Sequence, residues 1–335
     1  MEDRVVIDNF EPFNELFYKT CFYNSLFPII KHYQREIFPI LINDVSLYGE
    51  VIEKDKLDFN IKYLPNKNIC DLLMHIGIKL KSYKKKDNLV EEIKNSIEQK
   101  MPVIIRIDCF LEPFRRDAYM KKHIPHTLLI YGYDECNRQF NIIEHKNKDT
   151  LSYEKKTIKY EDLINAYEAY FDNFGVFNPP PSYYEFQLIN QQSSSSKHYT
   201  TKDYTECFIE NIKLHKEAIL NGLDNLNNFS NKVYEITQNE TELLENIDTL
   251  INIFNLIINC KEIEMYKITK LFGKEHELFR LLTKNIENAN LVRSAIARYK
   301  YSNIYKKEVI ELTINKFKNN YDLENKYYKY LFELL

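Results

Sequence analysis

Three residues in the first half of the chain are of types that together perform nucleophilic catalysis: Cys21, His126 and Glu144. A cysteine attacks as its thiolate, which the positive end of a helix and a nearby imidazole both stabilise. A carboxylate bonded to the second imidazole nitrogen fixes the tautomer of the ring. These types indicate covalent chemistry at a thiol if the fold brings them together.

The first element that must position them is a helix. The segment Cys21–Ile30 predicts a helix that begins at or near Cys21 and buries its apolar residues. Pro28 suits such a helix only in its first turns, because proline lacks the amide hydrogen that a helix interior uses. A second helix is predicted over 88–99 from its apolar spacing.

Three runs with strand-like sequences follow and predict strands. They cover 102–108, 126–133 and 139–145. The last two are joined by Asp134–Arg138, a turn of hairpin length. Such a hairpin would return Glu144 to the side of the strand that His126 opens. A helix followed by antiparallel strands predicts the α+β class.

Proline and glycine usage divides the chain into two parts. All ten prolines lie at or before Pro181, and the run Gln191–Ser196 is typical of an exposed linker. We predict a first domain over 1–190, a linker over 191–200 and a second domain over 201–335.

The predicted second domain has helical periodicity. Asp203 and Glu206 have the spacing of a capping box, and an apolar stripe runs from Leu243 to Ile257 at intervals of four and three. About four amphipathic helices without proline predict an all-α domain, either an antiparallel bundle or a helical cap.

Composition argues against several other classes of protein. The 46 basic and 49 acidic residues give a net charge of −3, which does not favour nucleic-acid binding. Six glycines and the absence of GxGxxG or Walker motifs argue against a nucleotide-cradling enzyme. The six cysteines form no CxxC pair, so no disulfide framework or zinc ribbon is indicated. Without a signal-peptide pattern or a long apolar run, we expect a cytoplasmic protein that has no membrane partner.

The sequence around the three residues resembles a known family. Cys21 is followed by Ser25-Leu26, the run 102–108 reads Pro-Val-Ile-Ile-Arg-Ile-Asp, and the run from His126 reads His-Thr-Leu-Leu-Ile-Tyr-Gly-Tyr-Asp. These motifs resemble the papain-like family that includes the N-terminal domain of butirosin biosynthesis protein H. They are more distantly similar to the cysteine peptidases of bacteriocin exporters. The resemblance implies a papain-like cysteine-protease fold, with the cysteine on an N-terminal helix and the histidine and acid on an antiparallel sheet.

That resemblance assigns roles to the candidate residues. It implies that Cys21 is the nucleophile and that His126 is the general base and acid. The third member of the family's triad is usually an aspartate, and here Glu144 stands in its place. Asp134 and Asp149 are the alternatives for this role.

The resemblance also points to residues that bind the oxyanion or the substrate. Papain-like enzymes usually have a glutamine six residues before the cysteine, where this chain has Glu15, which cannot donate a hydrogen bond when ionised. Asn14 and the Cys21 backbone amide are then the candidate oxyanion donors. Glu15 and Asp108 could face a polyamine, although Asp108 could equally bond backbone amides within the fold.

The function implied by the resemblance is that of a cysteine-dependent acyltransferase or amide synthase. An acyl group would pass from a phosphopantetheine thioester on an acyl or peptidyl carrier protein to Cys21, and then to a small amine or diamine. The setting would be the biosynthesis of a specialised metabolite such as a peptide antibiotic. The enzyme would need no cofactor of its own, and we expect the amide synthase of closthioamide assembly to be a close relative.

Three other hypotheses about the function stay open on the basis of the sequence alone. With water as acceptor, the same triad would make a peptidase or amidase. A catalytically silent fold would bind a carrier protein, for which the basic runs Lys81–Lys86 and Lys326–Lys329 offer surfaces. A metal site could be formed by His123, His126, Cys109 and Cys136. The spacing of these residues fits no standard zinc pattern, however, and we predict no metal.

Overall fold

The computed structural model describes residues 3–53, 57–145, 152–175, 179–189 and 200–334. The chain divides into two compact units. The first comprises Met1–Ile37 and Asn68–Ser196, and the second comprises Phe38–Lys67 and Lys197–Leu335. Each unit is therefore built from two separate stretches of sequence.

This division differs from the predicted domains 1–190 and 201–335. One boundary does fall inside the predicted linker, between Ser196 and Lys197. The segment Phe38–Lys67, however, belongs with the C-terminal helices and not with the predicted first domain. Most of the predicted linker lies outside the described residues, so its exposure stays a prediction.

The first unit is built on an antiparallel sheet of seven strands. Their order is β10-β9-β8-β7-β11-β6, and β1 pairs with β8 beside this path. The strands are β1 (Arg4–Val6), β6 (Ile78–Tyr83), β7 (Val103–Asp108), β8 (Pro125–Asp134), β9 (Gln139–His145), β10 (Tyr153–Lys159) and β11 (Tyr183–Leu188). The three predicted strands and the hairpin between β8 and β9 are confirmed. The α+β class is confirmed with them.

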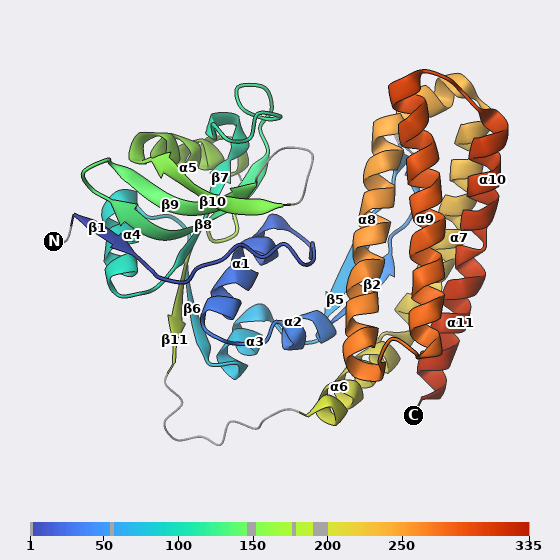
Figure 1. The fold of residues 1–335 in the computed structure, drawn as a ribbon, viewed down its shortest axis with the longest axis horizontal. Coiled ribbons are helices and arrows are strands. Elements are labelled where there is room, and N and C mark those ends of the chain that lie inside the picture. The colour runs from blue at the N-terminus through green and yellow to red at the C-terminus, as the bar shows by residue number, and fades with distance from the viewer. Residues whose placement is uncertain (1–2, 54–56, 146–151, 176–178, 190–199, 335) are drawn as a thin grey trace. The chain divides into compact units, whose positions relative to one another are not determined.

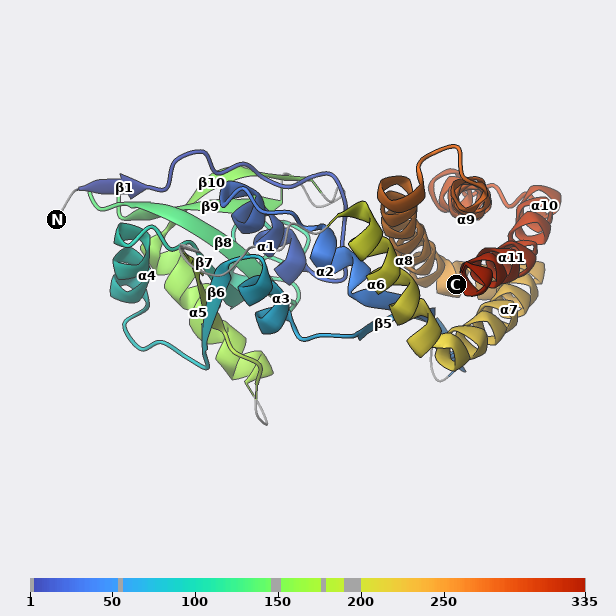
Figure 2. The same ribbon diagram turned by 90° about the horizontal axis from the view of Figure 1, so that it is seen from below.

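Helices cover both faces of this sheet. They are α1 (Cys21–His32), α3 (Ile69–His75), α4 (Leu89–Glu98) and α5 (Tyr160–Phe174), with a short 3-10 helix η1 (Cys109–Leu111) after β7. Figures 1 and 2 show α1 on one side of the sheet and α4 and α5 on the other. The predicted helices at 21–30 and 88–99 are confirmed.

Pro28 lies inside α1 rather than in its first turn. The helix tolerates this proline because the residues around it, Leu26 through Ile30, are all buried against the rest of the unit. Tertiary packing thus offsets the lost backbone hydrogen bond.

Gly132 is the glycine of the Gly-Tyr-Asp motif, and its surroundings show why a glycine is found there. It lies in β8 at an irregularity in the pairing with β9, opposite Asn141. A Cβ at this position would approach the Val5 carbonyl oxygen to 2.9 Å. The glycine is therefore needed for the close approach of β1 to β8.

The second unit combines helices with the segment Phe38–Lys67. That segment forms α2 (Phe38–Ile42), β2 (Asp44–Tyr48), β3 (Ile52–Glu53), β4 (Leu57–Asp58) and β5 (Ile61–Pro65), and β2 pairs with β5. The helices are α6 (Thr201–Leu214), α7 (Lys216–Gln238), α8 (Glu240–Phe272), α9 (Glu277–Ser302), α10 (Lys307–Lys318) and α11 (Asn320–Glu333). The ring of Phe59 stacks on Phe229 of α7 with centroids 4.1 Å apart, so the segment shares the helical core.

The helical prediction holds for this unit, but its first cap was misplaced. The capping box consists of Thr200 and Asp203, so the N-cap residue of α6 lies three residues before the predicted cap Asp203. Asp203 is its third helical residue, whose carboxylate accepts the Thr200 backbone amide at 2.8 Å. Within the part of the chain that the structure describes, no helix is long and apolar enough to cross a membrane.

Candidate active site

Cys21 is the first residue of α1, which follows the N-cap residue Thr20. The first turn of α1 contains no acidic residue, so no carboxylate there offsets the positive end of the helix dipole. Cys21 as a residue is intermediate between buried and exposed. This position favours the thiolate form of Cys21.

His126 and Glu144 are brought together by the hairpin of β8 and β9. His126 Nε2 lies 2.9 Å from Glu144 Oε2, and the side chains are 4% and 0% exposed. The second carboxylate oxygen of Glu144 accepts the His145 backbone amide at 2.7 Å. Glu144 thus holds the ring of His126 through Nε2 and leaves Nδ1 for other partners.

The thiol of Cys21 interacts with this pair. Burial raises the pKa of the thiol, but the charge of His126 and hydrogen bonds with His126 and Thr127 outweigh it and lower the pKa to about 7. Burial lowers the pKa of His126, but Glu144 and Cys21 raise it well above its usual value. Near neutral pH the site therefore favours a thiolate beside an imidazolium.

Ser25 holds α1 against β8. It lies one helical turn after Cys21, on the same face of α1. Its hydroxyl is 3.3 Å from both the carbonyl oxygen and the hydroxyl of Thr127, the residue next to His126. The Cys-x3-Ser spacing thus fixes the register between the helix and the strand of the site.

Asp108 is an internal anchor for the segment after β7. One carboxylate oxygen accepts the backbone amides of Phe110 and Ile124 at 3.0 and 3.1 Å. The other lies 2.6 Å from His123 Nδ1 and 3.1 Å from Asn173 Nδ2. With no exposed surface, Asp108 bonds within the fold, and the expectation that it faces an amine substrate is not supported by its contacts.

We expect Asp108→Ala to lower the free energy of unfolding by about 3 kcal/mol, because it leaves buried amides without an acceptor. Denaturant titration followed by circular dichroism measures this loss. Asp172→Ala, at an exposed position of α5, is the matched control and should change stability by less than about 0.5 kcal/mol. Equal stability of the two variants would contradict the anchoring role.

Asn14 lies near the site but is engaged with the backbone. Its side-chain amide donates to the carbonyl of Tyr153 at 2.9 Å, and its oxygen accepts the Tyr153 backbone amide at 2.7 Å. It thus ties the N-terminal segment to the start of β10. Glu15 is exposed. The role of the Cys21 backbone amide as oxyanion donor stays a prediction.

Of the two alternatives to Glu144, the structure describes Asp134, which lies at the far end of β8 from His126. Asp134 ends β8 and accepts the backbone and side-chain amides of Asn137 at 2.9 Å each, within the hairpin turn. Asp149 lies outside the described residues. Glu144 is thus the candidate acid that the described structure brings to His126.

The structure does not bring together all four residues that were considered as a metal site. Cys136 lies in the turn beyond β8, about 30 Å along the strand from His126 at the usual rise per residue. Among the described residues, the side chains of His126, Glu144 and His145 are close enough to share a metal ion. His126 and Glu144 are bonded to each other at 2.9 Å, and the absence of a metal stays a prediction.

Several side chains at the site were not identified from the sequence. Thr127 bonds the thiol, and the buried hydroxyl of Tyr153 has no hydrogen-bond partner in the described structure. Tyr153 lies near Cys21, His126 and Glu144. Adjacency to His126 could have pointed to Thr127, but nothing in the sequence connects Tyr153 with these residues.

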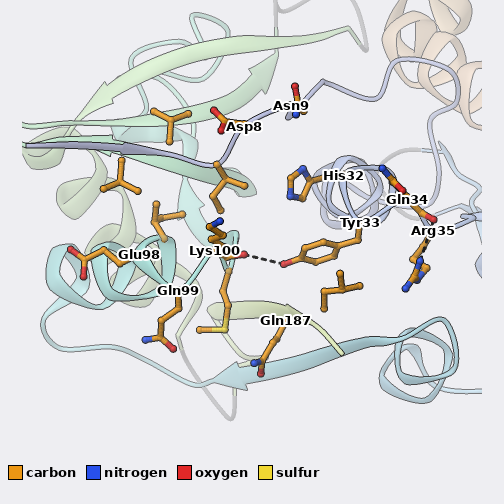
Figure 3. A pocket seen from close by; sticks show the side chains of 16 residues that line it. Asp8, Asn9, His32, Tyr33, Gln34, Arg35, Glu98, Gln99, Lys100 and Gln187 are labelled. Carbon is orange, nitrogen blue, oxygen red and sulfur yellow. Dashed lines mark hydrogen bonds between the residues drawn. The ribbon is translucent and has the colours of Figure 1, made fainter. Parts of the chain in front are cut away.

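A cavity of about 970 Å³ lies elsewhere in the first unit (Figure 3). Its lining includes His32 and Tyr33 at the end of α1, and the Tyr33 hydroxyl donates to the Lys100 carbonyl at 3.3 Å. Cys21 lies at the opposite end of α1, about 16 Å away at 1.5 Å per residue. The cavity is thus separate from the thiol.

One segment of the chain is similar to a known protein family. Residues 59–145 match the family model described as butirosin biosynthesis protein H, N-terminal. This segment contains His126 and Glu144, whereas Cys21 precedes it. No curated protein matches the chain. The resemblance to this family that the sequence motifs predict is thus confirmed over residues 59–145, where the chain is similar to the family model. The expected relationship to the amide synthase of closthioamide assembly stays a prediction.

Proposed function

We propose that this protein is a cysteine-dependent acyltransferase that forms an amide bond. The observation that carries the proposal is the arrangement of Cys21, His126 and Glu144, in which a thiol with a pKa of about 7 lies at the start of a helix. A helix-borne cysteine beside a sheet-borne histidine and acid also supports a papain-like fold. These three residues are the proposed catalytic triad.

The reaction proceeds in two transfers. The Cys21 thiolate attacks the carbonyl carbon of an acyl thioester, and the departing thiol takes its proton from His126. An amine then attacks the carbonyl carbon of acyl-Cys21, and His126 accepts the proton that the amine loses. The sulfur of Cys21 leaves as the thiolate, which restores the starting state. The Cys21 backbone amide is the proposed donor to the oxyanion.

A thioester donor suits a cysteine nucleophile. Exchange of an acyl group between two sulfur atoms is nearly balanced in energy, so acyl-Cys21 keeps its reactivity toward nitrogen. The donor we propose is a carrier protein with a phosphopantetheine arm, and the acceptor is a small amine or diamine. The enzyme itself then needs no cofactor.

The family match supports a biosynthetic role. Butirosin biosynthesis protein H takes part, by its name, in making butirosin, and we infer a comparable place in specialised-metabolite biosynthesis for this chain. An acyl transfer to an amine builds a bond, as such a pathway requires. Hydrolysis by the same triad is the alternative that experiment must separate.

Intact-protein mass spectrometry after incubation with acyl thioesters tests the proposal. We expect the wild-type protein to gain the mass of the acyl group and Cys21→Ala to gain none. Cys136→Ala, which removes an exposed thiol in the β8–β9 turn, is the matched control and should still be acylated. The acyl group should then be discharged as an amide when small amines or diamines are added.

Other outcomes would overturn the proposal in distinct ways. Discharge of the acyl group only as free acid would make the protein a hydrolase. Failure of wild-type protein to accept an acyl group from any thioester, carrier-bound ones included, would indicate a binding protein without catalytic activity.

A further inference from the structure

The loop that joins β7 to β8 carries exposed apolar and cationic side chains (Figure 1). It covers residues 109–124 and begins with η1. Tyr119 and Met120 are 40% and 60% exposed, although both have large apolar side chains. Lys121 and Lys122, which follow directly, are exposed as well. Adjacent apolar side chains at the surface, rimmed by polar ones, are typical of a surface that binds a partner.

Hydrogen bonds tie this loop down at its ends and at its tip. Asp108 accepts the backbone amides of Phe110 and Ile124. The Cys109 amide donates to the Ile124 carbonyl at 3.0 Å, which closes the base of the loop. The Met120 amide donates to the Phe110 carbonyl at 2.9 Å. Because these bonds fix the backbone, a partner that binds the loop loses little free energy to ordering it.

The net charge that the 109–124 loop presents is positive. Of its two carboxylates, Glu112 is buried. The other, Asp117, pairs with the Arg115 guanidinium at 2.9 Å. Three cations of the loop are exposed, and the described residues offer them no carboxylate within ion-pair distance: Arg116, Lys121 and Lys122. The loop therefore favours a partner with negative charge.

The 109–124 loop lies at the end of the sheet that carries the proposed triad. Lys122 is four positions before His126, so their Cα atoms are at most about 14 Å apart at 3.6 Å per residue. Phe114 packs under the Lys156 ammonium of β10, which lies 4.9 Å from the ring centroid. The same ammonium donates to the carbonyl of His145, which directly follows the acid of the triad. A partner bound to the loop is thus held beside the site.

We propose that the 109–124 loop is the docking surface for the carrier protein that donates the acyl group, an inference that rests on the proposed function. A phosphopantetheine arm is attached to its carrier through a phosphodiester, which is negatively charged. The face of the carrier around this attachment must approach the thiol, because the arm has a fixed length. The loop cations attract the phosphodiester and the acidic side chains of that face, and Tyr119 and Met120 pack against its apolar side chains.

The two basic runs predicted from the sequence suit this role less well. In the first run, Lys85 pairs with Glu168 at 2.5 Å. Lys86 pairs with Glu92 at 2.7 Å, so two of the charges of this run are compensated within the fold. The second run, Lys326–Lys329, belongs to the second unit and not to the unit of the triad.

Binding of a carrier protein tests the proposal directly. The probe is the holo acyl carrier protein of bacterial fatty-acid synthesis, labelled with a fluorophore at its N-terminus, and fluorescence anisotropy at low salt measures its Kd. We expect Lys121→Glu/Lys122→Glu to raise this Kd at least about tenfold, because two attractive charges become repulsive. Added salt should weaken binding to the wild-type protein. Lys306→Glu/Lys307→Glu, which reverses two adjacent exposed lysines of the second unit, is the matched control and should leave the Kd within about twofold.

A second variant tests the apolar part of the loop. Met120 has a φ of 53°, and asparagine tolerates this left-handed conformation better than most residues. Met120→Asn therefore keeps the backbone and should raise the Kd about threefold through loss of apolar contact. No binding to wild-type protein, or an equal Kd for wild-type protein and Lys121→Glu/Lys122→Glu, would overturn the proposal.

Acyl transfer separates this inference from the proposed function. The same acyl group is offered on the carrier, on coenzyme A and on N-acetylcysteamine, a thiol without phosphate. Lys121→Glu/Lys122→Glu should lose about tenfold in kcat/KM with the carrier and keep the wild-type rate with N-acetylcysteamine, which also shows that it is folded. An equal loss with coenzyme A would show that the loop binds phosphate alone, which would overturn docking of the carrier. Failure of all three thioesters to acylate Cys21, with the binding results as expected, would instead overturn the proposed function alone.

Discussion

His126→Ala is expected to reduce acylation of Cys21 at pH 7 by at least about a thousandfold. Two effects combine, namely the loss of the thiolate and the loss of the acid and base. Without His126, burial raises the pKa of the thiol while the largest opposing influence is gone, so the pKa moves above the ordinary value of 9.0. The thiolate fraction at pH 7 then falls about 50-fold, and loss of proton transfer supplies a further 10²-fold or more.

The pH dependence of alkylation separates these two effects. Wild-type protein should show a step in the rate of reaction with iodoacetamide near pH 7, where the Cys21 thiolate forms. In His126→Ala this step should move above pH 9, so reactivity lost at pH 7 returns in alkaline solution. Acyl transfer should not return with it, because the missing acid and base is still absent.

A matched histidine provides the control for this prediction. His32 lies at the last position of α1, at the opposite end from Cys21, and His32→Gln should leave the step near pH 7. If His126→Ala kept a thiol step near pH 7, the imidazole would not be the source of the low pKa. Cys21 would then owe its acidity to the helix dipole and Thr127.

Lys261→Met is expected to lower the free energy of unfolding by about 3–5 kcal/mol. Lys261 of α8 pairs with Glu324 of α11 at 2.7 Å, and the side chains are 2% and 0% exposed. The Tyr48 hydroxyl of β2 donates to the same carboxylate at 2.9 Å. Removing the lysine leaves a buried carboxylate without its counter-charge, which costs far more than the pair contributes.

The double variant Lys261→Met/Glu324→Gln tests this reason. It should regain at least half of the lost stability, because the buried charge is gone and an oxygen remains for the Tyr48 hydroxyl. Lys284→Met, which breaks the exposed pair with Glu287, should cost less than about 0.5 kcal/mol. Denaturant titration with circular dichroism measures all three variants. A double variant as unstable as the single one would show that the charge is not the cause.

The same network holds the segment Phe38–Lys67 in the helical unit. Ser46 of β2 bonds Glu264 of α8 at 3.2 Å, and Lys267 donates to the Asp44 carbonyl at 2.9 Å. Lys267 also pairs with Glu264 at 2.8 Å. We therefore expect loss of Lys261 to loosen β2 as well as the contact between α8 and α11.

Local patterns in the sequence determined the elements that carry the proposed triad. Apolar spacing placed the start of a helix at Cys21, and α1 begins there. Strand-like runs placed β7, β8 and β9, and the length of Asp134–Arg138 predicted the hairpin between β8 and β9. A short hairpin determines which residues face one another, so the neighbourhood of His126 and Glu144 followed from sequence alone.

Only the tertiary structure decided how these elements combine. The segment Phe38–Lys67 has ordinary strand and helix patterns, and these patterns do not specify which core it joins. Asn14 was predicted as an oxyanion donor, yet backbone groups of Tyr153, far away in sequence, engage its amide. Residue types and local spacing are written in the sequence, whereas desolvation and contacts between distant segments exist only once the chain is packed.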